Sequence, residues 1–564
     1  MHPVWSSTRG VLFFVCRILS LEKPAGFWLV SDREHHMYRV VFFGEPGSGK
    51  TTLSARIAKE LGLPVVEASQ EVIFPVAALK TLPKEEELIA YLAGQTASAN
   101  VPVSREIARR TFSALRETYG GEIIAKVLHA KFVEVPQKES CIFSGLRGLD
   151  NARFCRLHND LVIYLTADRA TLGERLQQKY GTTAEEAVKE LIDEQTLFQT
   201  SEIANVADLV VDTSLLGIDA AVAVIRKKID AWTRMCTRCV NVAKNPAMKF
   251  NENGLCHICE AYLAQFDPNQ LTKELEILNG CKRNTGHDVM VGISGGKDST
   301  STLYQIKKMG FNPLAFTFDT GYLPETTIPR SQAVARKLGV AHEVIDIRPY
   351  LQKIDIETYE RLADLYDLPF TLETKQIFRD AYEEGRKHYS ITCAHAATFV
   401  RSCQICRRMV IRAYHGEATA RGIGAVVLGM NEWTNLSASQ SDTLQTVSGM
   451  RVLQPSSEQS AVTVFHVPFL LRRTIADVER DLAELAWDPP AGENLIESNS
   501  NSCLLARSTE YMAKRLLEFH PDSTRLAREV TVGFLSKEQA LAALGKIHPY
   551  QHSPREVLKK AGIL

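Results

Sequence analysis

The chain has 564 residues, of which 45% are hydrophobic and 23% charged, so it is neither disordered nor fibrous and is long enough for about three domains. Its 66 Lys and Arg residues balance 66 Asp and Glu residues, which excludes binding of polyanions through bulk charge but not through a local basic groove. The 12 cysteines are too sparse for a disulfide scaffold, and half of them form Cys-x-x-Cys pairs, the pattern of metal or redox sites in a reducing compartment. We therefore expect a cytoplasmic protein.

The first 36 residues contain one apolar run, Gly10 to Leu19. This run is too short to span a bilayer and is interrupted by Arg17, so we predict no membrane association. Residues 1–36 are expected to be a poorly ordered leader, since the first strong strand pattern begins directly after them.

Residues 37–232 are predicted to form an α/β domain. Tyr38 to Phe43 is a continuous apolar run that ends in a glycine-rich turn, and Thr51 to Leu61 then has helical periodicity. Further apolar runs alternate with helical stretches, as a parallel sheet requires, at residues 140–144, 161–166 and 208–212.

The glycine-rich turn of this domain, residues 44–51, has Walker A spacing between a strand and a helix. Its glycines let backbone N–H groups face phosphate oxygens, and the helix N-terminus adds partial positive charge. Lys50 would reach the β and γ phosphates of ATP, and Thr51 would supply a hydroxyl to Mg²⁺. The predicted nucleotide-binding residues are Gly44, Gly47, Gly49, Lys50, Thr51 and Thr52.

Three segments of this domain resemble the adenylate kinase group, especially its dephospho-CoA kinase-like branch: residues 44–52, 143–147 and 166–175. The resemblance implies a small-molecule kinase in which Lys50 is catalytic, Arg147 holds the acceptor and Arg175 faces the transferring phosphoryl group. Ser144-Gly145 stands where the family has an aspartate. A nucleotide-sensing or structural domain is therefore the alternative.

A short segment, residues 233–265, contains two Cys-x-x-Cys pairs separated by sixteen residues. This spacing is typical of a four-cysteine zinc ribbon, in which Zn²⁺ supplies folding energy that so short a segment cannot gain from apolar burial. We predict that one Zn²⁺ is bound by Cys236, Cys239, Cys256 and Cys259.

Residues 266–488 are predicted to form a second α/β domain around another glycine-rich turn, residues 294–299. This turn lies between a strand at 289–293 and a helix at 300–309, so its backbone amides can approach a pyrophosphate. Later strands are expected at 314–318, 342–347 and 425–428, and helices at 331–338 and 410–421.

The second turn resembles the SGGxDS signature of the N-type ATP pyrophosphatases, the PP-loop enzymes. These enzymes attach AMP to a carbonyl or amide oxygen, which makes that oxygen a leaving group. By this resemblance Ser294, Gly295 and Gly296 bind ATP, and the catalytic residues are Lys297, Asp298 and Ser299. Segments 235–262, 316–323 and 502–505 also resemble the N-acetyl sugar amidotransferases. The PP-loop pattern further implies nucleotide contacts at Asp319, Gly429 and Asn431.

The third cysteine pair, Cys403 and Cys406, is not followed by a second pair. Residue types alone favour a buried thiol pair or a redox disulfide. Residues 403–407 and 426–431, however, resemble the tRNA thiolation branch of the same enzymes. That resemblance implies a 4Fe-4S cluster held by Cys403, Cys406 and Cys503, the last supplied by a C-terminal helical piece at 489–564.

Three functions follow as hypotheses. The first is a sulfurtransferase, in which sulfur from a donor held on the cluster attacks the adenylate. The second is an amidotransferase supplied with ammonia by a partner glutaminase. The third is a non-catalytic nucleotide-sensing regulator. We favour a nucleotide or sugar as acceptor over tRNA, because the chain is neutral overall, and a homodimer is compatible with the sequence.

Overall fold

A computed structural model describes residues 38–94, 103–133, 140–388, 395–434, 447–487, 503–547 and 549–564. The predicted leader at 1–36 and the polar stretch at 489–501 lie outside these residues. In this described part of the chain, no helix is both long and apolar enough to cross a membrane.

The first sheet has five parallel strands in the order β2-β3-β1-β4-β5. They are β1 (Arg39–Gly44), β2 (Val65–Glu67), β3 (Cys141–Ser144), β4 (Leu161–Thr166) and β5 (Leu209–Asp212). The strand β1 is central, so its carboxyl end lies where the chain crosses from one half of the sheet to the other. This is the position at which α/β sheets bind ligands.

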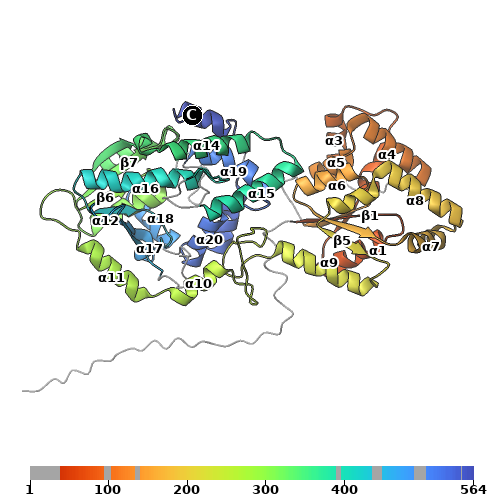
Figure 1. Cartoon of the computed structure of the whole chain (residues 1–564), viewed down its shortest axis with the longest axis horizontal. Helices are drawn as coiled ribbons and strands as arrows, with labels where there is room; N and C mark the ends of the chain where they lie inside the picture. Colours follow the sequence, from red (N-terminus) through yellow and green to blue (C-terminus); the bar gives the residue numbers. More distant parts are fainter. Residues whose placement is uncertain are drawn as a thin grey trace, which may run out of the picture. The chain divides into compact units, whose positions relative to one another are not determined.

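Helices cover both faces of this sheet (Figure 1). Val40 and Phe42 of β1 pack on α1 and α9, whereas Val41 and Phe43 pack on α3 to α6 on the other face. The helices are α1 (Lys50–Leu61), a π-helix (Ser69–Ile73), α2 (Phe74–Ala77), α3 (Glu85–Ala93), α4 (Arg105–Tyr119), α5 (Ile123–Phe132), α6 (Leu149–Leu157), α7 (Arg169–Tyr180), α8 (Ala184–Phe198), a 3₁₀ helix (Thr200–Asn205) and α9 (Ile218–Thr233).

The second sheet has six strands in the order β10-β11-β9-β6-β7-β8. They are β6 (Val289–Gly292), β7 (Pro313–Asp319), β8 (Ala341–Asp346), β9 (Ala425–Leu428), β10 (Met450–Leu453) and β11 (Val462–His466). Five strands are parallel, but β10 runs antiparallel to β11 at the edge. The α/β architecture predicted for this domain, with a mostly parallel sheet, is confirmed, and the one antiparallel strand forms an edge hairpin with β11.

Helices also cover both faces of the second sheet, and a helical group completes the chain. They are α10 (His257–Gln265), α11 (Pro268–Asn279), α12 (Lys297–Lys308), α13 (Thr327–Lys337), a 3₁₀ helix (Arg348–Tyr350), α14 (Lys353–Tyr366), α15 (Leu372–Lys387), α16 (Ser402–Ala420), α17 (Val467–Leu470), α18 (Ile475–Glu484), α19 (Leu504–Leu517), α20 (Ser523–Thr531), α21 (Lys537–Gly545) and α22 (Pro554–Lys560).

The helix α16 begins eight residues earlier than the sequence pattern predicted. Its buried residues include Ser402, Ile405, Met409 and Ala413, which continue one apolar face through the first turns. Cys403 and Cys406 are consequently inside the helix rather than in a loop before it. A spacing of three residues places both thiols on one side of α16.

Candidate functional site

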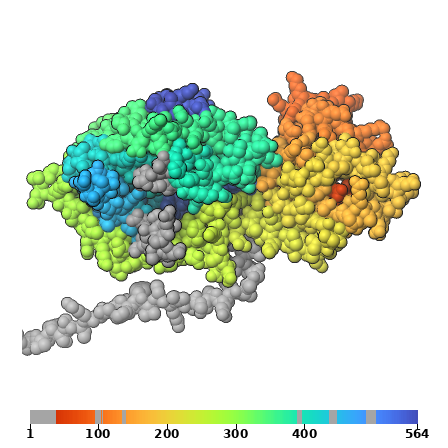
Figure 2. Space-filling model, in the orientation of Figure 1, coloured from red at the N-terminus to blue at the C-terminus, as the bar shows by residue number. Residues whose placement is uncertain are grey.

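The Walker loop borders a cavity of about 640 Å³. Its wall combines residues 46–53 with residues from β2, β3, α4 and α7. In the space-filling view, red atoms from the start of the described chain lie at the bottom of a hollow framed by later segments (Figure 2). Thr51 and Thr52 at the end of the loop are exposed, and the cavity extends from the loop towards residues at the ends of β2 and β3.

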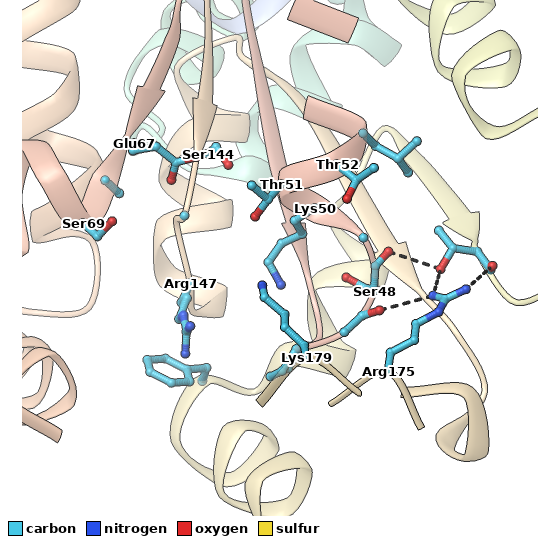
Figure 3. Close-up of a pocket in the computed structure, with 18 of the residues that line it drawn as sticks. Ser48, Lys50, Thr51, Thr52, Glu67, Ser69, Ser144, Arg147, Arg175 and Lys179 are labelled. Atoms are coloured by element: carbon cyan, nitrogen blue, oxygen red, sulfur yellow. Dashed lines mark hydrogen bonds between the residues drawn. The ribbon is translucent and has the colours of Figure 1, made fainter. Parts of the chain in front are cut away.

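Lys50 lies at the start of α1 and points into this cavity (Figure 3). Its ammonium group donates hydrogen bonds to the carbonyls of Gly44 at 2.5 Å and Glu45 at 2.8 Å. Burial lowers the pKa of Lys50 to about 7, and the nearby Arg147 guanidinium adds to this effect. A bound triphosphate would supply the missing negative charge and favour the protonated lysine.

The two arginines expected at this site are held by other groups of the protein. Arg147 lines the cavity, and its Nη1 lies 2.8 Å from Oε2 of the buried Glu194. Arg175 donates to the carbonyl of Gly47 at 3.2 Å and to Thr213 at 2.9 Å. Their roles at acceptor and phosphoryl group stay predictions. Lys179, one turn after Arg175, also lines the cavity, although no motif singled it out.

The four cysteines of the 233–265 segment meet in one buried cluster. The sulfurs of Cys236 and Cys259 are 3.8 Å apart, and those of Cys239 and Cys256 are 3.6 Å apart. A tetrahedral site with metal–sulfur bonds of about 2.3 Å requires sulfur separations of about 3.8 Å. The cluster therefore has the size of a single-ion site.

Zinc removal gives a first prediction. Replacing Cys239 and Cys256 together by serine should reduce bound zinc from one ion per chain to none, and should lower the melting temperature, because these cysteines pack with Leu526 and Val530 of α20. Metal analysis and thermal unfolding measure both effects. The matched control is Cys281→Ser, a half-buried thiol outside the cluster. Full zinc content in the double variant would contradict the prediction.

The second glycine-rich loop follows β6 and leads into α12, as the sequence predicted. Gly295 has φ +70°, and a Cβ atom there would lie 2.6 Å from the Cβ of Arg330, so only glycine fits against α13. Its carbonyl accepts hydrogen bonds from Arg330 at 3.1 Å and Trp487 at 3.3 Å. The hydroxyls of Ser294 and Ser299 are 3.2 Å apart. These contacts fix the position of the loop at the carboxyl end of β6.

Residues from the end of β9 lie against the start of α12. A Cβ on Gly429 would be 3.0 Å from the backbone of Asp298, so this close approach also needs glycine. Lys297 forms an ion pair with Asp298. Asp298 Oδ1 and Asn431 Oδ1 are buried and accept no hydrogen bond within the described chain. Two such oxygens are the donors that Mg²⁺ prefers, so the residues present fit a magnesium ion.

Two acidic residues near this loop, Glu432 after β9 and Glu529 on α20, were indicated by no motif. Glu432 pairs with Arg528 at 2.5 Å, and the buried Glu529 pairs with Arg525 at 2.7 Å. Burial raises the pKa of Glu529, and the Asp298 and Glu432 carboxylates act in the same direction. The carboxylates of Asp298, Glu432 and Glu529 are therefore close enough for their charges to interact. They come from segments about a hundred residues apart, so the spacing of residues in the sequence could not reveal this cluster.

Two cysteines of the predicted cluster, Cys406 and Cys503, lie beside Tyr322, three residues after Asp319, and Cys403 lies close enough to Cys503 to raise the pKa of its thiol. The carbonyl of Tyr322 accepts from the Leu504 amide at 3.1 Å, directly beside Cys503. Burial raises the pKa of Tyr322, the nearby Cys406 acts in the same direction, and the Tyr322 hydroxyl is 3.1 Å from that of Tyr359. Cys406 and Cys503 pack on the same apolar cluster as Tyr322. The topology thus brings the cysteines next to the strand that ends in Asp319.

Burial raises the pKa of all three thiols, that of Cys403 to about 12. Binding of iron as thiolate must therefore release protons. Unlike the four ribbon cysteines, Cys403, Cys406 and Cys503 are not among the described groups whose ligand atoms all lie within 4.8 Å. The three sulfurs therefore do not form a compact single-ion group of the kind that the ribbon cysteines form.

The first domain and the second domain are similar to different groups of known proteins. Residues 288–397 match the family model described as "Queuosine biosynthesis protein QueC". A cytidylate kinase from Ignicoccus hospitalis is 24% identical over 200 residues, covering 34% of this chain and 98% of the kinase. A 7-cyano-7-deazaguanine synthase from Psychromonas ingrahamii is 41% identical over 66 residues, covering 12% of this chain and 30% of the synthase. A shikimate kinase structure from Bacteroides thetaiotaomicron has a TM-score of 0.22 and 16% identity, covering 35% of this chain and 99% of that one.

The chain therefore joins a P-loop kinase-like domain to a domain that resembles the QueC proteins, and the relatives of both domains are named as enzymes. The sequence predictions of a kinase-like first domain and a PP-loop second domain are confirmed. The narrower assignments, to a sugar-amidotransferase or a tRNA-thiolation branch, remain predictions. The match to the synthases spans about a third of their length.

Proposed function

We propose that the PP-loop domain adenylates a carbonyl or amide oxygen and replaces it with sulfur. The observation that carries this proposal is that Cys403 and Cys406 lie near Cys503, and that Cys406 and Cys503 lie beside Tyr322, close to the strand that ends in Asp319. Three cysteines leave one iron of a 4Fe-4S cluster without a protein ligand. When bound, the cluster would offer that iron to hold sulfide.

In the first step the acceptor oxygen forms a bond to the α phosphorus of ATP, the α–β bridging bond breaks, and pyrophosphate leaves. The amides of residues 294–296 and Lys297 bind the departing pyrophosphate, while Asp298 and Asn431 would hold Mg²⁺ against the phosphates. Sulfide then attacks the activated carbon, and AMP leaves with the oxygen. No oxidation or reduction is needed.

The kinase-like domain is proposed to transfer the γ phosphoryl group of ATP to a small molecule. Its Walker loop and Lys50 would bind the phosphates of ATP and Thr51 would hold Mg²⁺, which together form the donor half of such a reaction. The four-cysteine group is proposed to hold structural zinc, for which its sulfur spacing is suited. We also propose that a separate sulfur donor supplies the sulfide and that the protein is cytoplasmic.

Nitrogen transfer is the second candidate, and a specific observation favours it. The synthases similar to residues near the second loop are named for 7-cyano-7-deazaguanine, a product with a nitrogen in its cyano group. In that case ammonia, from a partner glutaminase, would attack the same adenylate. The three cysteines would then have a structural role only.

Iron content separates the two candidates and forms the second prediction. After anaerobic purification, the wild-type chain should be brown and contain iron and sulfide, and Cys403→Ala or Cys503→Ala should remove both. Cys281→Ala is the matched control and should keep them. Mass spectrometry of metabolites incubated with the protein, ATP and either sulfide or ammonium then identifies the incoming atom. A colourless, iron-free wild-type protein that consumes ammonium would reject the sulfur candidate.

A further inference from the structure

The acceptor side of the Walker cavity carries a carboxylate that no motif indicated. Glu67 ends β2 and lines the cavity with Ser69 and Ser144, across from Lys50 (Figure 3). Within the described residues, its carboxylate takes part in no hydrogen bond or ion pair. A carboxylate in this position faces whatever molecule occupies the cavity.

The backbone around Glu67 leaves space for its side chain. Glu67 lies opposite Ser144 in the pairing of β2 with β3, and Gly145 follows with φ +77°. A Cβ atom at Gly145 would lie 2.9 Å from Glu67 Oε2, closer than such atoms normally approach. Any other residue at 145 would therefore displace the carboxylate. The glycine that replaces the family aspartate makes room for an acid from the neighbouring strand.

The arginine side chains on the acceptor side of the cavity already form ion pairs with carboxylates of the protein. Arg147 pairs with the buried Glu194 at 2.8 Å. Arg109, also on the cavity wall, lies 3.6 Å from Glu190. A phosphate on the acceptor would have to compete with both carboxylates, and Glu67 would repel it as well. The acceptor side is thus unfavourable for a second phosphate.

The donor side has the opposite charge. Lys50 and Lys179 line the cavity near the loop, and the N-terminus of α1 adds partial positive charge. The γ phosphate of ATP would therefore lie between cations on one side and the Glu67 carboxylate on the other. This polarity suits transfer from a phosphate to a neutral hydroxyl group that must lose a proton.

Resting on the proposed phosphotransferase function, we infer that the acceptor presents a hydroxyl group rather than a phosphate, and that Glu67 is the catalytic base. A bond forms between the acceptor oxygen and the γ phosphorus, the bond from this phosphorus to the β–γ bridging oxygen breaks, and ADP leaves. The hydroxyl proton moves to Glu67. Phe112 and Phe198, with ring centroids 4.6 Å apart, provide an apolar wall suited to a sugar or nucleoside ring.

The experiment measures transfer from γ-labelled ATP by the full chain to a panel of pentoses, hexoses and nucleosides, and to CMP, UMP, AMP and GMP. Wild type should label hydroxyl acceptors and not the monophosphates. Glu67→Gln should slow that transfer about 100-fold without changing ATP affinity. Glu106→Gln, an exposed acid on α4, is the matched control and should change neither. Preferential labelling of a monophosphate, or full activity of Glu67→Gln, would overturn the inference.

Binding provides a readout that does not depend on turnover. With a non-hydrolysable ATP analogue present, CMP should bind Glu67→Gln about tenfold more tightly than wild type, since one repulsive charge is removed. If wild type labels no acceptor of either class, the phosphotransferase proposal fails. The inferred repulsion between Glu67 and an acceptor phosphate would still be tested in that case. Equal CMP affinity of wild type and Glu67→Gln would overturn it.

Discussion

Lys297→Ala is expected to reduce formation of AMP and pyrophosphate by about 30- to 900-fold, equivalent to about 2–4 kcal/mol of transition-state stabilisation. Lys297 begins α12, pairs with Asp298 and lies 5.4 Å from the Phe534 ring centre, so the protein itself fixes its position at the loop. As the α–β bond of ATP breaks, negative charge grows on the departing pyrophosphate. Removing the ammonium leaves that charge without its nearest cation.

The assay uses the full chain in a Lys50→Ala background and separates AMP from ADP by chromatography, so that the kinase-like site does not contribute. Lys308→Ala is the matched control: it lies on the same helix, but its ammonium is exposed and pairs with Glu484. AMP production should be unchanged in this control. ADP as the only product, or undiminished AMP from Lys297→Ala, would contradict the assignment of the second loop.

The sequence predicted the phosphate-binding loops well because each is a local structure. A strand, a glycine-rich turn and a helix follow one another within about 25 residues in both domains, and backbone requirements restrict the residue types at each position. Gly295 illustrates this, since the contact with Arg330 excludes a side chain. The same locality explains why the four ribbon cysteines could be assigned from their spacing.

Site residues that come from distant segments of the chain could not be predicted from local sequence patterns. Glu67 ends a strand of only three residues, too short to show a period, and reaches the cavity because β2 pairs with β3. Glu529 approaches the second loop from α20, far along the chain. The start of α16 was predicted too late, at residue 410, although Ser402 and Ile405 already continue the buried face of the helix.

Lys50→Ala should lower phosphoryl transfer by the kinase-like domain about a thousandfold while leaving pyrophosphate release at the second loop intact. If the product of the first site is the substrate of the second, conversion of the unphosphorylated acceptor should stop, and supplying the phosphorylated acceptor directly should restore it. A short covalent connection raises the effective concentration of one site at the other to about the millimolar range. Such proximity would favour transfer of the phosphorylated product from the first site to the second.

Proton uptake provides an independent test of Lys50. Because burial lowers the pKa of Lys50 to about 7, the lysine is largely neutral at pH 8 before ATP binds. Triphosphate charge raises that pKa, so binding should take up a proton at pH 8, and the uptake should disappear at pH 6, where the lysine is already charged. Calorimetry in buffers of different ionisation enthalpy measures this for the first site in a Lys297→Ala background, and Lys50→Ala should abolish it. If Lys50→Ala left the conversion of the unphosphorylated acceptor unchanged, the kinase role would be wrong and the first domain would be a nucleotide-sensing or structural domain.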